Sequence, residues 1–208
     1  MPANKKVAVL TSGGLDSAIL ISYLSKKYDS VYPIYIQSGH VWEGAELASL
    51  KRFLKTIRNQ RLKPLVILSL STADLYPKHW SFSGKKIPGA KSHDTQVYLP
   101  GKNIFLIAKA SVFCALNRVP SLALGPLKTN PFPDASPAFF KMMERACSKG
   151  LQYRIRILTP FLNLTKKEVI SLGRHLPLEL TFSCLRPKGH SHCGRCNKCA
   201  ERKKVIAH

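Results

Sequence analysis

Acidic residues are scarce in this chain of 208 residues, which has 11 Asp and Glu against 33 Lys and Arg and a formal net charge of +22. It also lacks an apolar stretch long enough to cross a bilayer, and its first residues, MPANKK, lack the apolar region of a secretion signal. There are no internal repeats and no low-complexity tract. We therefore expect a soluble cytoplasmic protein without a membrane partner.

The excess of positive charge indicates which kinds of partner the protein could attract. A field of this sign attracts polyphosphate, nucleic acid or an acidic protein. The basic residues are spread over several segments, however, and no RNA-binding signature accompanies them. This distribution favours a solvated basic surface over a dedicated nucleic-acid groove. The main basic segments are 51–63, 78–91, 141–156 and 195–204.

The segment 7–17, VAVLTSGGLDS, joins a buried-strand pattern to a glycine turn and an apolar helix. Gly13 and Gly14 allow close approach of the backbone, and the N–H groups at the start of a helix can hold a phosphate. Ordinary turn and cap chemistry is the structural alternative for these residue types. The spacing of a Walker loop is absent, so the segment does not predict transfer of a γ-phosphate.

Strand and helix patterns alternate along the chain. This alternation predicts an α/β fold with a doubly wound, mainly parallel five-stranded sheet. Ligands of such sheets bind at the carboxyl ends of the strands, where the glycine loop, Gly39 and Gly125 are expected to converge. The predicted strands are 7–10, 31–36, 65–70, 121–125 and 155–158, and the predicted helices begin near 16, 46, 104, 141 and 166. The segment 71–96 is expected to be a lid or a mobile loop whose histidines, His79 and His93, are solvated.

Four cysteines lie close together near the end of the chain, in the spacing C-x8-C-x2-C-x2-C. Cysteines separated by two residues can bind one ion, and four thiolates close a tetrahedral zinc site, which makes the site structural. A redox dithiol or an iron–sulfur cluster is the alternative. The predicted zinc ligands are Cys184, Cys193, Cys196 and Cys199. The chain is accordingly divided into an α/β domain that carries the phosphate-binding glycine loop, 1–175, and a zinc-binding segment, 176–208.

The string SGGLDS resembles the signature of the pyrophosphate-loop ATP pyrophosphatases, which cleave ATP between the α and β phosphates. Together with the strings that follow, it resembles the 7-cyano-7-deazaguanine synthases over nearly the whole chain. These strings are YLPGKN, PFPDASPAFF, TPFLNLTKKEVI and TFSC followed by CGRCNKCAERKK. The resemblance implies an adenine nucleotide alpha hydrolase-like fold with a zinc-binding appendage, ATP with Mg²⁺, and a homodimer.

The activity that the resemblance implies is the conversion of 7-carboxy-7-deazaguanine and ammonia to 7-cyano-7-deazaguanine in queuosine biosynthesis, an AMP-forming ligase reaction. Asp16 is implied to hold magnesium or order the loop, and Lys102 to stabilise negative charge on ATP. Asp134 is implied to orient the amine or the polar edge of the base, with an N-cap role as its alternative. The implied ATP-binding residues are Thr11, Ser12, Gly13, Gly14, Leu15, Asp16, Ser17, Lys102 and Asn103.

The chain departs from the family pattern where the substrate would bind. Lys102 stands where the family usually has Arg, and a lysine cannot clamp a carboxylate with two parallel hydrogen bonds as a guanidinium does. Ala135, Ser136 and Ala138 replace a Cys, an Arg and a Glu. Two alternatives therefore stay open: a ligase that joins a deazaguanine carboxylate to a protein or nucleic-acid amine, and a zinc-knuckle module that binds nucleic acid.

Overall fold

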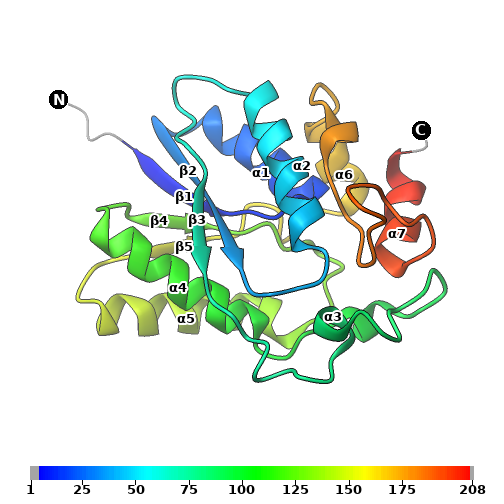
Figure 1. Cartoon of the computed structure of the whole chain (residues 1–208). Helices are drawn as coiled ribbons and strands as arrows, with labels where there is room; N and C mark the ends of the chain where they lie inside the picture. The colour runs from blue at the N-terminus through cyan, green and yellow to red at the C-terminus, as the bar shows by residue number, and fades with distance from the viewer. Residues whose placement is uncertain (1–4, 207–208) are drawn as a thin grey trace.

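The computed structural model describes residues 5–206, which form one sheet covered by helices on both faces (Figure 1). All neighbouring strands pair in parallel, in the order β3-β2-β1-β4-β5. The strands are β1 (Lys6–Leu10), β2 (Ser30–Gln37), β3 (Val66–Ser69), β4 (Ser121–Ala123) and β5 (Arg156–Leu158). The predicted doubly wound parallel sheet of five strands is confirmed.

The two faces of the sheet are covered by different helices, because successive side chains of a strand point to opposite faces. Val7 and Val9 of β1 pack with α1 (Leu15–Ser25), α2 (Glu43–Thr56) and α6 (Lys166–Leu172). Ala8, between them, packs on the other face with α4 (Lys102–Leu116) and α5 (Pro137–Gly150). Val7, Ala8 and Val9 are all fully buried, which explains why the middle of β1 is apolar on both faces.

The segment 71–96 differs from the expected mobile loop. It contains α3 (Trp80–Ser83) and the first residues of η1 (Asp94–Val97). The histidines of this segment act as helix caps, since the ring nitrogens of His79 and His93 accept from the backbone N–H two residues later. The segment is also tied to the end of the chain, where the backbone N–H of Asn197 donates to the Pro88 carbonyl at 3.0 Å.

Three further elements complete the fold: η2 (Pro133–Ala135), η3 (Leu178–Leu180) and α7 (Asn197–Ile206). Helix α7 contains Cys199, the last cysteine of the cluster, and lies at the same end of the molecule as α3 (Figure 1). A capping box begins α6, with Thr165 and Glu168 bonded reciprocally. None of the helices between residues 5 and 206 is long and apolar enough to span a membrane. The division of the chain at residue 175 stays a prediction.

Candidate functional site

The glycine loop between β1 and α1 is held by its own hydroxyl groups. The Ser12 hydroxyl accepts from the Gly14 N–H at 3.1 Å, and the Ser17 hydroxyl accepts from the Ser12 N–H at 3.1 Å. Gly13 lies against α2, where an added Cβ would come within 2.9 Å of the Glu46 carbonyl oxygen. Position 13 therefore has to be glycine, because a backbone atom of α2 occupies the space that a side chain would need.

A cleft with two compartments, of about 400 Å³ and about 270 Å³, opens over this loop. Both compartments are lined by Ser12, Asp16, Lys102 and Asn103. The smaller one lies over the carboxyl ends of β1, β2 and β4, where strand order reverses, and is lined by His40 and Gly125 among others. The predicted convergence of the glycine-bearing turns on one cleft is confirmed, and parallel sheets bind ligands at this point.

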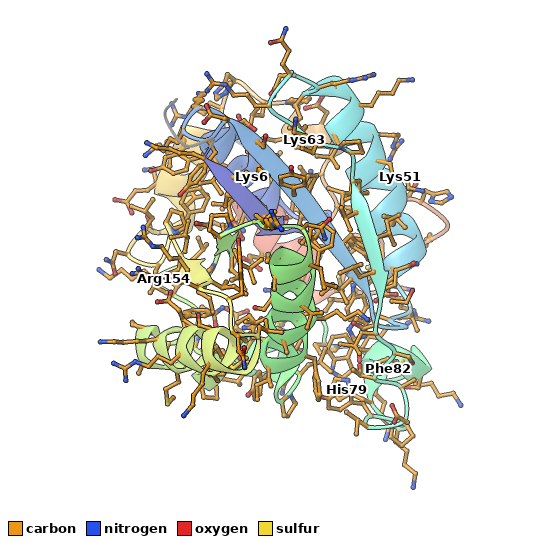
Figure 2. All side chains as sticks on the ribbon, turned by 90° about the vertical axis from the view of Figure 1, so that its left-hand side faces the viewer. Lys6, Lys51, Lys63, His79, Phe82 and Arg154 are labelled. Carbon is orange, nitrogen blue, oxygen red and sulfur yellow. The ribbon has the colours of Figure 1, made fainter. Side chains whose placement is uncertain are left out.

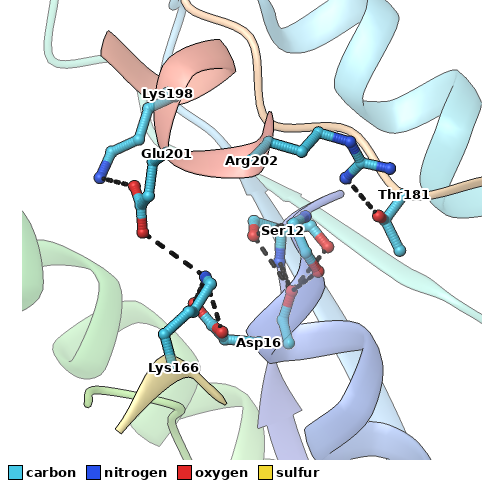
Figure 3. Close-up of polar contacts among 9 residues, drawn as sticks. Ser12, Asp16, Lys166, Thr181, Lys198, Glu201 and Arg202 are labelled. Atoms are coloured by element: carbon cyan, nitrogen blue, oxygen red, sulfur yellow. Dashed lines mark hydrogen bonds and ion pairs between the residues drawn. The ribbon is translucent and has the colours of Figure 1, made fainter. Parts of the chain in front are cut away.

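A chain of alternating charges crosses the larger compartment (Figure 3). The Lys166 ammonium lies 2.8 Å from both carboxylate oxygens of Asp16 and 3.6 Å from Glu201. Glu201 in turn pairs with Lys198 at 2.7 Å. Among residues 5–206 these are the ion pairs that the structure contains. They connect the glycine loop, α6 and α7, three elements far apart in the sequence.

The ion pairs shift the pKa values of the two acids differently. Burial raises the pKa of the Asp16 carboxyl, and the Lys166 ammonium opposes that shift. Burial acts on Glu201 in the same direction, but Lys198 and Lys166 together outweigh it and its pKa is lowered. Glu201 therefore keeps a full negative charge beside Lys166.

Asp134 is bonded directly to the start of α4, although it lies 31 residues further along the sequence. Its carboxylate accepts from the backbone N–H of Asn103 at 3.0 Å, and the Asn103 side chain donates to the Asp134 carbonyl at 2.8 Å. The alternative role proposed from the sequence, an N-cap of the following helix, is wrong, because Ser136 caps α5 by accepting from Phe139. The contacts of Asp134 fix the first turn of α4, which carries Lys102 at the cleft.

His40 is the most unusual polar residue at the cleft. Its side chain is 8% exposed, and neither ring nitrogen has a hydrogen-bond partner among the described residues. The ring stacks on Trp42 with 4.6 Å between centroids. Burial, with a further contribution from Lys102, lowers the pKa of His40 to about 3, so the imidazole is neutral at pH 7.

Sequence reasoning placed none of five residues at the cleft, although all of them line it: His40, Lys166, Lys198, Glu201 and Arg202. Lys166 follows the Thr165 cap directly, and a helix that starts after a parallel strand begins at the carboxyl edge of the sheet. The sequence therefore already indicated that Lys166 lies near the cleft. The residues of α7 carried no such signal, since the cysteine spacing does not show where the helix docks.

The four predicted metal ligands come together. Their Sγ atoms all lie within 4.8 Å of one another, with 3.9 Å between Cys193 and Cys199 and 4.0 Å between Cys184 and Cys196. A tetrahedral ion with bonds of about 2.3 Å to sulfur requires separations of about 3.8 Å, so the cluster fits a four-thiolate metal site. Backbone N–H groups of Leu185 and Arg186 donate to two of the sulfurs, as expected around thiolates.

The parallel sheet and the glycine loop at its switch point define the fold of the pyrophosphate-loop ATP pyrophosphatases. Two solved structures share it, each with a TM-score of 0.51. One is a predicted subunit of tRNA methyltransferase from Methanocaldococcus jannaschii, 18% identical, covering 82% of this chain and 76% of that one. The other is a 4-thiouridine synthetase–RNA complex with bound ATP, 17% identical, covering 97% of this chain and 50% of that one.

Within this class, the family model described as "Queuosine biosynthesis protein QueC" matches residues 6–208. The chain belongs to the QueC family. A 7-cyano-7-deazaguanine synthase from Leptospira interrogans is 32% identical over 97% of this chain and 86% of its own length. A 7-cyano-7-deazaguanine synthase from Desulfitobacterium hafniense is 26% identical over 97% of this chain and 91% of its own length. One from Thermoplasma volcanium is 27% identical over 96% of this chain and 86% of its own length.

Proposed function

We propose that this chain catalyses the ATP-dependent conversion of 7-carboxy-7-deazaguanine and ammonia to 7-cyano-7-deazaguanine. Membership of the QueC family and the names of the curated relatives support this reaction. The structural observation that carries the proposal is the cleft itself: two compartments meet at Ser12, Asp16 and Lys102. Such an arrangement lets two substrates meet at the glycine loop.

The nucleotide occupies the smaller compartment. This compartment lies at the switch point of the sheet, and the glycine loop with the N-terminus of α1 borders it. The flat deazaguanine occupies the larger compartment, which offers aromatic surfaces. Tyr98 stacks on Phe132 at 4.9 Å and Trp42 on Trp80 at 5.6 Å between ring centroids, and all four rings line it. The α-phosphorus of the nucleotide then faces the carboxylate across Asp16 and Lys102.

The reaction consumes two ATP molecules. The substrate carboxylate attacks the α-phosphorus, pyrophosphate leaves, and ammonia displaces AMP from the acyl adenylate to give an amide. The amide oxygen then attacks the α-phosphorus of a second ATP. Loss of AMP and two protons from the adenylated amide leaves the nitrile, so that both carboxylate oxygens depart with AMP. The protein contributes mostly by positioning and by stabilising charge.

The side chains around the loop carry that stabilisation. Lys166 and Lys102 place positive charge where pyrophosphate leaves, and Asp16 orients Lys166 through both carboxylate oxygens. Thr11 to Ser17 and Asn103 form the binding surface for the phosphates. Asp16 would hold the Mg²⁺ that accompanies the nucleotide, and the ion would supply positive charge to the phosphates. Asp134 acts as a positioning residue through Asn103.

Zinc is the ion we propose for the four cysteines. Four thiolates leave no position for water or substrate, so the ion is structural. It holds α7, whose Cys199 is a ligand and whose Lys198 and Glu201 reach the cleft. The homodimer and the cytoplasmic location expected from the sequence stay predictions, the first of which sedimentation of the purified protein would test.

The activity test is incubation of the purified protein with ATP, ammonium and 7-carboxy-7-deazaguanine, followed by mass spectrometry. We expect two AMP for each nitrile formed, and labelled ammonium should place its nitrogen in the nitrile. AMP formation without nitrile, with attachment of the base to an added peptide or oligonucleotide, would favour the alternative ligase. No AMP with this substrate would contradict the proposal.

A further inference from the structure

A second large hollow lies at the opposite end of the sheet from the glycine loop. Its volume is about 720 Å³. Lys6, Ser121 and Arg156, the first residues of β1, β4 and β5, border it, so the hollow follows the amino ends of these strands. Figure 2 looks onto this end of the molecule, with Lys6 and Arg154 labelled. The hollow shares no lining residue with the cleft. We call it the basic groove; its other lining residues are Lys5, Lys27, Tyr28, Pro120, Tyr153 and Arg154.

Charge in the basic groove has one sign. Five of its lining residues are Lys or Arg and none is acidic. Within residues 5–206, none of the five forms an ion pair, because every ion pair lies at the cleft. The acids are concentrated there as well: five of the eleven, Asp16, Glu43, Glu46, Asp134 and Glu201, line the cleft. Five of the 33 basic residues of the chain are therefore gathered, without an ion-pair partner, in a concave surface at the other end. One acid lies beside it, since the Asp29 carboxylate accepts from the backbone N–H of Lys5 at 2.8 Å.

Two half-buried aromatic rings lie among these cations. Tyr28 packs beside the core face that contains β1 and α1, and Tyr153 packs beside the opposite face. The hydroxyl groups of both have no partner among the described hydrogen bonds. No aliphatic side chain other than Pro120 lines the groove. A partner or a membrane that is bound by inserting exposed aliphatic side chains finds no matching surface here.

We propose that the basic groove binds single-stranded nucleic acid. Lys5, Lys6, Arg154 and Arg156 neutralise consecutive phosphates, and the rings of Tyr28 and Tyr153 stack on unpaired bases. A groove of cations interleaved with aromatic rings suits a single strand, whose bases are exposed, better than a duplex, whose bases are covered. This binding is separate from the reaction proposed for the cleft and does not depend on it.

The test is fluorescence anisotropy with labelled 12-nucleotide single strands of mixed sequence, as RNA and as DNA, and with the DNA duplex. In the variant Arg154→Gln/Arg156→Gln we expect affinity to fall about ten-fold or more. The slope of log K against log salt should fall by about 1.4, since each lost phosphate contact removes about 0.7 for a single strand. The matched control is Lys51→Gln/Lys55→Gln, which removes the same charge from the exposed surface of α2 (Figure 2) and should change affinity little.

Stacking is tested by Tyr28→Leu and Tyr153→Leu, which keep an apolar side chain and remove the ring. Each should weaken single-strand binding about five-fold or more and leave duplex binding unchanged. Tighter binding of RNA or of DNA identifies the ligand. Equal effects of the groove and control double variants would overturn the proposal, as would absence of binding or equal affinity for single strand and duplex. AMP formation with the small substrate should be unchanged in all these variants, which separates this proposal from the activity at the cleft.

Discussion

At the scale of single residues, Lys166 organises the charges of the cleft. Within the described residues it is the one basic side chain that forms an ion pair with Asp16, which it reaches over 150 positions of sequence. Its ammonium lies between two carboxylates, 2.8 Å from Asp16 and 3.6 Å from Glu201, and both of them hold it in place. A positive charge oriented in this way stabilises charge that develops on a leaving pyrophosphate.

We predict that Lys166→Met lowers the rate of AMP formation by roughly 10²-fold, because one charged donor is lost and Asp16 is left without its partner. Initial rates at saturating ATP would measure the effect. The control is Lys167→Met, since Lys167 is the exposed neighbour on the same helix and should retain normal rates. Equal rates in the two variants would rule out the role of Lys166.

His40 gives a prediction on stability and pH. Its pKa is lowered to about 3 in the folded protein, below the value near 6.5 that it has when unfolded. Between these values the unfolded state binds the extra proton, so folding becomes less favourable as pH falls. At about 1.4 kcal/mol per pH unit below 6.5, His40 should account for about 2 kcal/mol of stability lost between pH 7 and pH 5.

Urea unfolding at pH 7 and at pH 5 would measure this. In His40→Phe, which keeps an aromatic ring beside Trp42 and cannot titrate, the loss of stability between the two pH values should be smaller by about that amount. The same pH dependence in wild type and variant would show that His40 is protonated in the folded protein. The difference between the two proteins removes the contributions of the other histidines.

At the scale of elements, α6 packs against α1 through a glycine. Gly173 ends α6, and a Cβ added there would lie 2.4 Å from Cγ1 of Ile19, a side chain that is 1% exposed. Ile19 belongs to the core beneath α1 and cannot move freely. This contact sets the distance between the helix that carries Lys166 and the helix that carries Asp16.

Gly173→Ala should therefore destabilise the protein by about 1 to 3 kcal/mol through overpacking, and should also slow AMP formation by displacing Lys166. Gly150→Ala is the control, because Gly150 ends α5 with no atom within 4 Å of the added Cβ. The control should be neutral or slightly stabilising. Unfolding in urea measures the stability of both variants, and the AMP assay measures the rate. A neutral Gly173→Ala would show that α6 and α1 adjust without cost.

At the scale of the whole molecule, the cysteine cluster and the cleft are linked through α7. Cys199 lies in the same helix as Lys198 and Glu201, one turn or less away from each. The Arg202 guanidinium also donates to the Thr181 hydroxyl at 2.6 Å and fixes the helix to the segment before the cluster (Figure 3). The metal site is thus expected to support the position of charged groups that line the cleft.

Removal of the metal with a chelator under reducing conditions should lower the melting temperature and then slow turnover, since binding energy of the metal is part of folding energy. Calorimetry would measure the melting temperature, metal analysis the metal content, and the AMP assay the turnover. Cys199→Ser should behave like the chelated protein. Cys147→Ser, a substitution in α5 outside the cluster, should keep both metal and activity. A chelated protein with an unchanged melting temperature would contradict the structural role.

The sequence by itself determined the fold class and the kinds of chemistry. Continuous apolar strands alternating with amphipathic helices allow few arrangements besides a parallel sheet with helices on both faces. The cysteine spacing determined a cluster whose sulfurs do come together, and the glycine loop determined where the cleft opens. These features could be predicted because each depends on neighbours in the chain, such as Gly13 and Gly14 or Cys196 and Cys199.

The tertiary structure decided which distant residues meet. Lys166 and Glu201 join Asp16 only because α6 and α7 are placed at the same edge of the sheet, and no local pattern contains that information. Asp134 has the residue type of a helix cap, yet its partner is Asn103 on another helix. The charge of the basic groove likewise adds up only when the amino ends of β1 and β5 lie together. Local geometry follows from the sequence of neighbours, whereas charge and burial depend on the packing of the whole chain.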